Sequence, residues 1–188
     1  MSGLSSNKSI KIFVLGKSSV GKSSLIKELM GQPDADIGDQ KEFTINLKIN
    51  EADFNLLVVE RSFENIENED LNSPDGFMLV YSVDDQQSFF ELKDIHKMIV
   101  KNRGTNKFCL IVVGNKSEIL EGRKIKREEG ERYSLETNVE FYETSVVKQN
   151  NVRESFLNLC QQILRVKYPE IFENNGQKNN NIRKCYCF

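Results

Sequence analysis

Long apolar segments are absent from this chain. Its 188 residues contain no run of about 18 apolar residues, so no transmembrane helix is expected. The first residues lack the apolar stretch of a secretory signal, and Ser2 stands where N-myristoylation needs glycine. We therefore expect a globular protein with neither a spanning helix nor an N-terminal lipid.

Histidine and cysteine are also scarce. His96 is the single histidine, and no cysteine or acid cluster accompanies it, so we expect a packed or solvated side chain rather than a metal ligand. Of the four cysteines, Cys109 and Cys160 fall within apolar runs and are expected to be reduced core residues. Reduced cysteines in the core are typical of cytosolic proteins.

The charge pattern argues against nucleic-acid binding. The chain has 26 Lys and Arg against 28 Asp and Glu, and neither a basic stripe nor an aromatic platform appears. An apolar content of 38% and a charged content of 29% are those of a soluble globular protein. The length suits one domain with a sizeable core.

One segment carries a phosphate-binding pattern. Residues 16–23 read GKSSVGKS and match G-x-x-x-x-G-K-[ST]. Gly16 and Gly21 let the backbone curl with its N–H groups pointing inward, while Lys22 places a positive charge on the phosphates and the Ser23 hydroxyl suits Mg²⁺. The expected phosphate contacts are Gly16, Ser18, Ser19, Val20, Gly21, Lys22, Ser23 and Ser24. The sequence therefore predicts binding of a nucleoside phosphate.

Strand and helix patterns alternate along the chain. Strands are expected at 10–15, 43–50, 54–59, 76–81, 107–113 and 140–142, and the clearest helices at 24–30, 86–101 and 152–163. Strict alternation at 43–49 indicates an edge or antiparallel strand, whereas continuous apolar runs indicate central parallel strands. The predicted fold is α/β: a single P-loop NTPase domain whose six-stranded, mostly parallel sheet has one antiparallel edge strand and helices on both faces.

The expected domain organisation is simple. Residues 1–8 form a flexible N-terminus, 9–168 the domain and 169–188 a hypervariable tail, of which the Asn-rich stretch 174–181 is typical of a disordered tether.

Two later segments each follow a strand at its carboxyl end, where ligands bind in open α/β sheets. They read Asn115-Lys116-Ser117-Glu118 and Glu143-Thr144-Ser145-Val146. In order and spacing they resemble the guanine-recognition segments of Ras-superfamily small GTPases, N-K-x-D and E-T-S-A-K. The resemblance covers roughly residues 9–166 and is closest to the Ras, Rap and Rheb branch.

The resemblance implies a role for each matching residue. Asn115 would tie the phosphate loop to the base-binding loop, and Lys116 would lay its alkyl stem along the purine. Glu118 would accept from the guanine N1 and N2 donors, and Ser145 with the Val146 N–H would complete the pocket. The family has Asp where Glu118 stands, so we expect a weakened guanine preference. The implied ligands are GTP or GDP with Mg²⁺.

The parts that sense the γ-phosphate depart from the family. The family Thr that binds Mg²⁺ with triphosphate has no counterpart in 32–40, and Thr44 is expected on the wet face of its strand. Glu60 stands where the family has an Asp that reaches Mg²⁺ through water, and the resemblance implies that Glu60 also reaches the metal through water. Phe63 replaces a mobile Gly, and Glu64 replaces the water-positioning Gln, so any catalytic role of Glu64 is doubtful.

These departures leave two functional classes open. The first is a slow GTPase switch that cycles with an exchange factor, a GTPase-activating protein and effector proteins. The second is a nucleotide-binding pseudo-GTPase that serves as a constitutive interaction module. A P-loop ATPase or small-molecule kinase is disfavoured, because neither needs Asn115-Lys116 and Ser145 at these positions.

The last four residues, CYCF, follow Arg183-Lys184 and match a prenylation box with Cys185 as the acceptor. A terminal Phe favours geranylgeranyl over farnesyl. We therefore expect the protein on the cytosolic face of a plasma membrane or endomembrane, with a cytosolic pool, because one prenyl chain binds reversibly.

Overall fold

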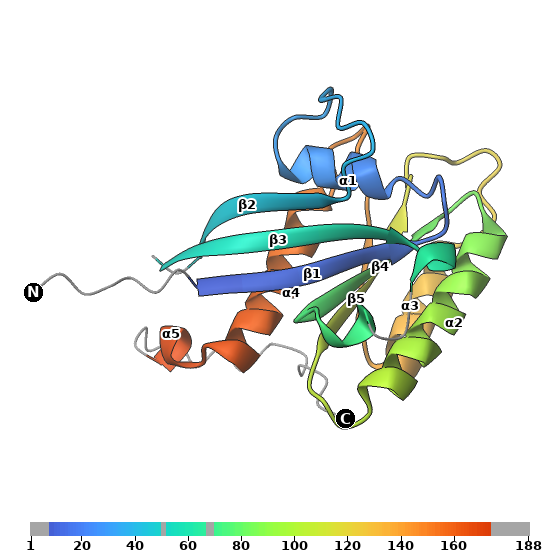
Figure 1. The fold of residues 1–188 in the computed structure, drawn as a ribbon. Helices are drawn as coiled ribbons and strands as arrows, with labels where there is room; N and C mark the ends of the chain where they lie inside the picture. Colours follow the sequence, from blue (N-terminus) through green and yellow to red (C-terminus); the bar gives the residue numbers. More distant parts are fainter. Residues whose placement is uncertain (1–7, 50–51, 67–69, 174–188) are drawn as a thin grey trace, which may run out of the picture.

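Six strands form one sheet in the order β2-β3-β1-β4-β5-β6 (Figure 1). This computed structural model describes residues 8–49, 52–66 and 70–173. The strands are β1 Lys8–Gly16, β2 Glu42–Ile49, β3 Ala52–Ser62, β4 Gly76–Ser82, β5 Cys109–Asn115 and β6 Glu140–Glu143. Neighbours pair in parallel except β2, which runs antiparallel to β3 at the edge. The predicted fold class is confirmed.

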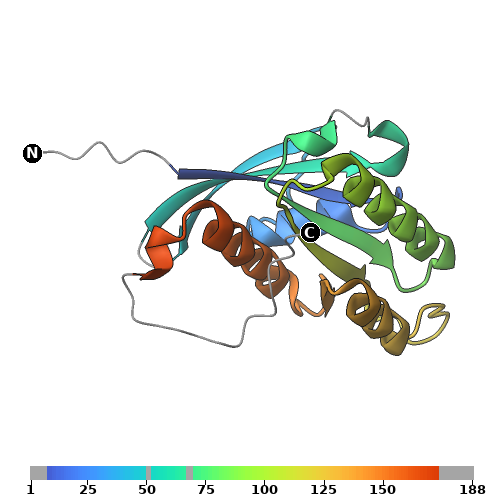
Figure 2. The same cartoon turned by 90° about the horizontal axis from the view of Figure 1, so that it is seen from below.

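Helices cover both faces of the sheet. They are α1 Lys22–Leu29, α2 Gln86–Arg103, α3 Arg127–Thr137, α4 Val152–Lys167 and the short α5 Glu170–Glu173. Helices α1 and α4 pack on one face and make the α1/α4 core, which includes Leu25, Val58 and Phe156. Helices α2 and α3 pack on the other and make the α2/α3 core, which includes Phe13 and Ile95. Figure 2 shows α2 and α3 on the opposite side of the strands from α4.

Burial along the strands follows the sequence pattern. In β2, Phe43, Leu47 and Ile49 are buried while the residues between them are exposed or half-buried. Every residue of β4 and β5 is buried, because helices cover both of their faces. Cys109 and Cys160 lie in the core as predicted.

Helix α2 is preceded by two acidic residues, Asp84 and Asp85, and one of them is its N-terminal cap. The Asp85 carboxylate accepts from the N–H groups of Gln87 and Ser88, so Asp85 is the cap. Such a cap stabilises a helix by about 1 kcal/mol. Asp84 is engaged elsewhere, since it accepts from the Ser82 hydroxyl.

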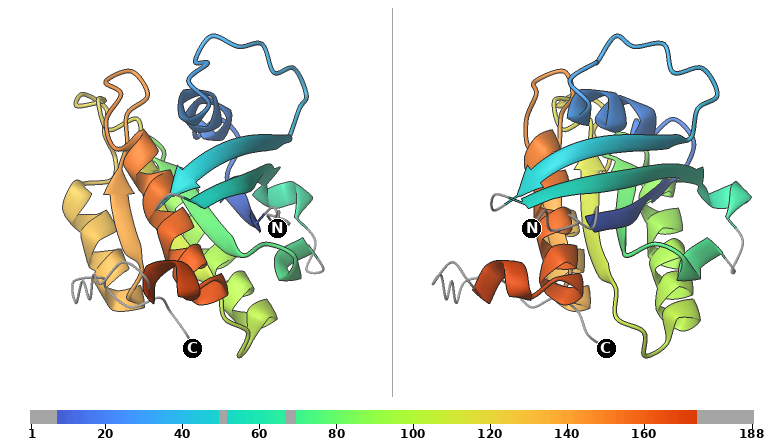
Figure 3. Two further views of the ribbon diagram at one scale, coloured as in Figure 1. Left: turned by 90° about the vertical axis from the view of Figure 1, so that its left-hand side faces the viewer. Right: turned by 60° about the vertical axis from the view of Figure 1, so that its left-hand side comes forward.

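The segment between β3 and β4 contains two short 3₁₀-helices, η1 Phe63–Asn65 and η2 Asp70–Asn72, which the sequence did not predict. A longer segment, 30–41, arches from α1 to β2 (Figure 3). Among the described residues no helix combines the length and apolarity needed to cross a bilayer. The predicted tether at 174–181 and Cys185 lie outside the described residues.

Candidate nucleotide-binding site

The phosphate loop connects the end of β1 to the start of α1, and its two glycines are required by close approaches. A Cβ on Gly16 would lie 2.3 Å from the carbonyl oxygen of Val80. Gly21 has φ of 95°, and a Cβ there would lie 2.3 Å from Nδ2 of Asn115. Both positions therefore exclude any side chain, and the loop N–H groups stay near the first turn of α1.

Lys22 lies inside this loop. Its ammonium donates to the carbonyl oxygens of Gly16 at 2.9 Å and Lys17 at 2.8 Å. Burial lowers the pKa of Lys22, the nearby charges of Glu60 and Glu64 oppose that shift, and the charge of Lys41 adds to it. The side chain is thus held at the loop by carbonyl groups that a phosphate oxygen can replace as its partner.

The other predicted loop residues differ in burial. Ser18, Ser19 and Ser24 are exposed, whereas Val20 is buried in the α1/α4 core. Ser19 has φ of 66°, a left-handed conformation that turns the chain between the two glycines.

Asn115, at the end of β5, joins the phosphate loop to the segment after β6. Its Nδ2 donates to the Val20 carbonyl at 2.9 Å, and its Oδ1 accepts from the Thr144 hydroxyl at 3.0 Å. Asn115 and Thr144 are both buried, so these bonds hold the loops where water does not compete. Sequence reasoning gave Thr144 no role, although its place between Glu143 and Ser145 was a usable signal.

The segment that contains Lys116 and Glu118 is bonded to the segment that contains Ser145, because the Ser117 N–H donates to the Thr144 carbonyl at 3.0 Å. One oxygen of Glu118, Oε2, is buried without a hydrogen-bond partner among the described residues. A buried carboxylate oxygen without a donor is costly, and the N1 and N2 donors of guanine are suitable partners. Lys116 has φ of 63°, and its ammonium lies 3.9 Å from Oδ1 of Asp84. The arrangement therefore fits a guanine base.

Ser145 and Val146 form a tight turn after β6. Ser145 is fully buried, and its hydroxyl accepts from the Lys148 N–H at 3.0 Å, which leaves its own proton to donate. The Val146 carbonyl accepts from the Gln149 N–H at 3.1 Å. The turn is thus fixed by its own bonds before any ligand binds.

The predicted metal residues contact each other directly. The Ser23 hydroxyl donates to Oε2 of Glu60 at 2.7 Å, and the Lys41 ammonium lies 3.5 Å from the other oxygen. Thr44 is exposed on β2, as its strand pattern predicted. Mg²⁺ prefers several oxygen ligands in octahedral geometry. The fit to Mg²⁺ is incomplete, because Ser23 and Glu60 already bond to each other and a lysine lies at the carboxylate.

Phe63 and Glu64 lie in η1, immediately after β3. Phe63 packs against the α2/α3 core, whereas Glu64 is exposed and its charge acts on Lys22. Arg61 does not supply a positive charge to the phosphate loop. Its guanidinium donates to Oε1 of Glu42 at 3.2 Å and lies over the Phe13 ring.

A further contact links the phosphate loop to α2. The ammonium of Lys17 lies 3.0 Å from Oδ2 of Asp85, the cap of that helix. The hydrogen bond raises the pKa of Lys17, and burial opposes it. Sequence reasoning missed this pair, because neither residue belongs to the phosphate-binding pattern's fixed positions.

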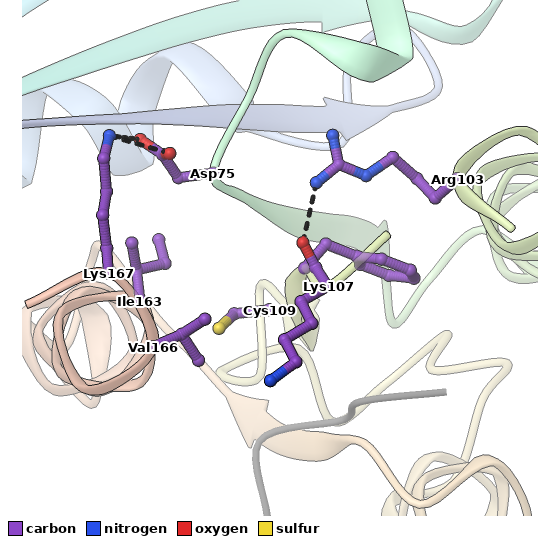
Figure 4. Close-up of a pocket in the computed structure, with 8 residues that line it drawn as sticks. Asp75, Arg103, Lys107, Cys109, Ile163, Val166 and Lys167 are labelled. Carbon is purple, nitrogen blue, oxygen red and sulfur yellow. Dashed lines mark hydrogen bonds and ion pairs between the residues drawn. The ribbon is translucent and has the colours of Figure 1, made fainter. Parts of the chain in front are cut away.

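A cavity of about 170 Å³ lies at the opposite end of the strands, by the first residues of β4 and β5 (Figure 4). Lys167 binds both oxygens of Asp75 at 2.9 Å, and Arg103 donates to the Lys107 carbonyl. Ile163 is among the apolar residues that complete the lining. These pairs hold α4 and α2 to the sheet, and the cavity is separate from the nucleotide site.

Comparison with known proteins agrees with this geometry. The Ras family model matches residues 11–165. The Ras-like protein rasS of Dictyostelium discoideum is 27% identical over 90% of this chain and 91% of its own length. The GTP-binding protein Rit1 of Mus musculus is 26% identical over 93% of this chain and 84% of its own, and the Ras-related protein Ral-B of Rattus norvegicus is 27% identical over 94% and 89%. The chain therefore belongs to the Ras family and is a Ras-like small GTPase.

Proposed function

We propose that this protein binds guanine nucleotide and hydrolyses GTP much more slowly than ordinary Ras proteins, as a signalling switch on a membrane. The observation that carries the slow step is the packing of Phe63 against the α2/α3 core. Ras proteins have Gly at this position, and its backbone swings to bond the γ-phosphate. A phenyl ring held by the core and a Cβ on the backbone both restrict that motion.

The negative charge of Glu64 beside the phosphate loop also slows GTP hydrolysis. Glu64 stands where the family Gln positions the attacking water, and its charge is close enough to act on Lys22. The transition state of phosphoryl transfer spreads negative charge over the phosphoryl oxygens, so a carboxylate there opposes it. Arg61 is turned toward Glu42 and does not compensate.

Guanine is the base that the site suits best. The unpartnered Oε2 of Glu118 needs a donor, and adenine has an acceptor at N1 and only a C–H at C2, where guanine has its N1 and N2 donors. The extra methylene of Glu118 relative to Asp displaces the carboxylate, which supports a weakened preference for guanine.

Single-turnover phosphate release from bound GTP tests the slow step. We expect a rate at least about tenfold below that of an ordinary Ras protein measured in parallel, a barrier difference of about 1.4 kcal/mol. An equal rate would contradict the proposal. As a control, GTP and ATP each compete with a bound fluorescent guanine nucleotide. This competition checks that the protein recognises the base.

The second candidate is a constitutive nucleotide-binding module. It is favoured by the contacts that Glu60 makes with Ser23 and Lys41, because they occupy groups that would otherwise respond to the γ-phosphate and its metal. Affinities for GDP and a non-hydrolysable GTP analogue, measured with Mg²⁺ and with chelator, separate the two. A large preference for one nucleotide over the other supports the switch, whereas equal affinities for the two support the module.

The switch requires an exchange factor, a GTPase-activating protein and effectors, which we propose as its partners together with a membrane. Membrane attachment rests on Cys185 as a prenyl acceptor, helped by Arg183 and Lys184. Replacing Cys185 with Ser should move the protein to the soluble fraction, while Cys187→Ser should not prevent prenylation. Retention of the Cys185→Ser variant on membranes would refute the anchor.

A further inference from the structure

Lys41 is fixed beside the carboxylate that other family members direct toward their metal ion. The Glu60 N–H donates to the Lys41 carbonyl at 2.7 Å, which holds the two backbones together just before β2 begins. The Lys41 ammonium then lies 3.5 Å from Oε1 of Glu60. The contact therefore follows from the backbone arrangement and not from a long side chain folding back by itself.

Both oxygens of the Glu60 carboxylate are engaged by groups of the chain itself. Its side chain is only 8% exposed, and its two oxygens face the Ser23 hydroxyl and the Lys41 ammonium. A buried carboxylate needs a compensating positive charge. Lys41 is the ammonium in ion-pair contact with it, so the local charge balance resembles that of a carboxylate beside a bound cation.

The contact between Lys41 and Glu60 also disfavours the binding of a divalent ion at Glu60. A cation within a few ångströms of Glu60 experiences the repulsion of the Lys41 ammonium, and that repulsion doubles for a charge of +2. The Ser23 hydroxyl, moreover, has its proton directed at Glu60 at 2.7 Å. Mg²⁺ binding would have to reorganise both contacts.

Lys41 also has the freedom to reach a phosphate. Its side chain is 49% exposed, and an ammonium has three donors, of which the contact with Glu60 uses one. Its positive charge contributes to the lowered pKa of Lys22 in the phosphate loop. An anion held by that loop would therefore lie within the field of two lysines.

We propose that Lys41 supplies the positive charge at the phosphates that a divalent cation supplies in other Ras-family proteins, so that nucleotide binding here depends little on Mg²⁺. This inference rests on the proposed guanine-nucleotide binding. It adds that Lys41 is a binding residue and that the affinity survives chelation of metal.

The test measures the affinity of the full chain for a fluorescent GDP after removal of copurified nucleotide, once with Mg²⁺ and once with chelator. For the unaltered protein we expect the two dissociation constants to agree within about threefold. Lys41→Met keeps the alkyl stem and removes the charge. It should weaken binding in chelator by about tenfold or more and make binding respond to added Mg²⁺.

Two variants serve as controls. Lys97→Met removes the same charge from the exposed face of α2, away from the loop, and should behave as the unaltered protein. Lys41→Arg keeps a cation and should retain metal-independent binding. Thermal melts without nucleotide check that Lys41→Met folds, since this variant removes a charge beside the buried Glu60 carboxylate.

The outcomes separate the two proposals. If chelation weakens GDP binding of the unaltered protein by about a hundredfold and Lys41→Met changes nothing, the role of Lys41 is refuted while nucleotide binding stands. If neither condition gives GDP binding, the proposed function and this inference both fail.

Discussion

The two ends of the nucleotide site are built in different ways. At the base end, Asn115 bonds to both neighbouring loops through buried groups, and Glu118 keeps a buried oxygen without a partner. At the γ-phosphate end, Glu60 is already bonded to Ser23 and Lys41. The base end is held by internal hydrogen bonds and still has one carboxylate oxygen without a partner. At the γ-phosphate end, the carboxylate already has partners within the chain. Recognition of a nucleotide and response to its third phosphate are therefore separable in this fold.

The largest effect is expected at Lys22, in the phosphate loop on which both ends depend. Lys22→Ala removes the ammonium from the phosphate loop and should weaken GDP and GTP binding by at least about a hundredfold, or about 2.7 kcal/mol. Titration calorimetry measures the loss. Lys27→Ala, in the same helix, is the matched control and should leave affinity unchanged. Equal binding by Lys22→Ala would remove the basis of the nucleotide site.

A change confined to the base end should alter selectivity and little else. Glu118→Asp restores the family carboxylate, and we expect the preference for GTP over ATP to rise about tenfold. Competition against a fluorescent guanine nucleotide measures it, with the hydrolysis rate of bound GTP as the control. A parallel rise in ATP binding would show that Glu118 does not read the base.

A change confined to the γ-phosphate end should alter the rate and not the selectivity. Phe63→Gly combined with Glu64→Gln frees the backbone and removes the misplaced charge, so GTP hydrolysis should accelerate several-fold, worth about 1 kcal/mol. The lost packing of Phe63 should lower stability by about 1–2 kcal/mol. Single-turnover assays and urea unfolding measure these quantities. An unchanged rate would show that Phe63 and Glu64 do not cause the slow hydrolysis of GTP.

The smallest effect is expected away from both ends, at His96. Burial lowers the pKa of this imidazole, whose Nδ1 lies 2.7 Å from the Tyr133 hydroxyl. The unfolded chain takes up the proton near pH 6.5 while the folded protein does not, so stability falls as pH drops below that value. His96→Gln should flatten the decline in Tm between pH 7 and 5 by a few degrees. Nucleotide affinity at neutral pH should stay constant in this variant.

Local patterns in the sequence were sufficient for the fold and for the loop between β1 and α1. The alternation at 43–49 predicted the edge strand β2, and the glycines and lysine of 16–23 predicted the phosphate loop. Thr44 pointed outward, as its place in that alternation required. Each of these features depends on neighbouring residues in the chain, which a single sequence displays.

Contacts between distant segments were not predictable in this way. The pairing of Lys41 with Glu60 depends on the register of β2 against β3, and that of Lys17 with Asp85 on how α2 meets the phosphate loop. The proximity of Asp84 to Lys116, whose ammonium lies 3.9 Å from Oδ1 of Asp84, likewise joins segments that are distant in the sequence. Side chains with several possible partners are resolved by packing, not by local pattern.

The narrow clearances at the two loop glycines have a consequence for mutational tolerance. An added methyl at Gly16 meets main-chain atoms of β4, which cannot rotate away, whereas one at Gly21 meets the amide of Asn115, whose bond to Val20 would break. A saturation library selected only for correct folding should therefore already be depleted at position 16. Depletion at position 21 should deepen when the selection also demands nucleotide.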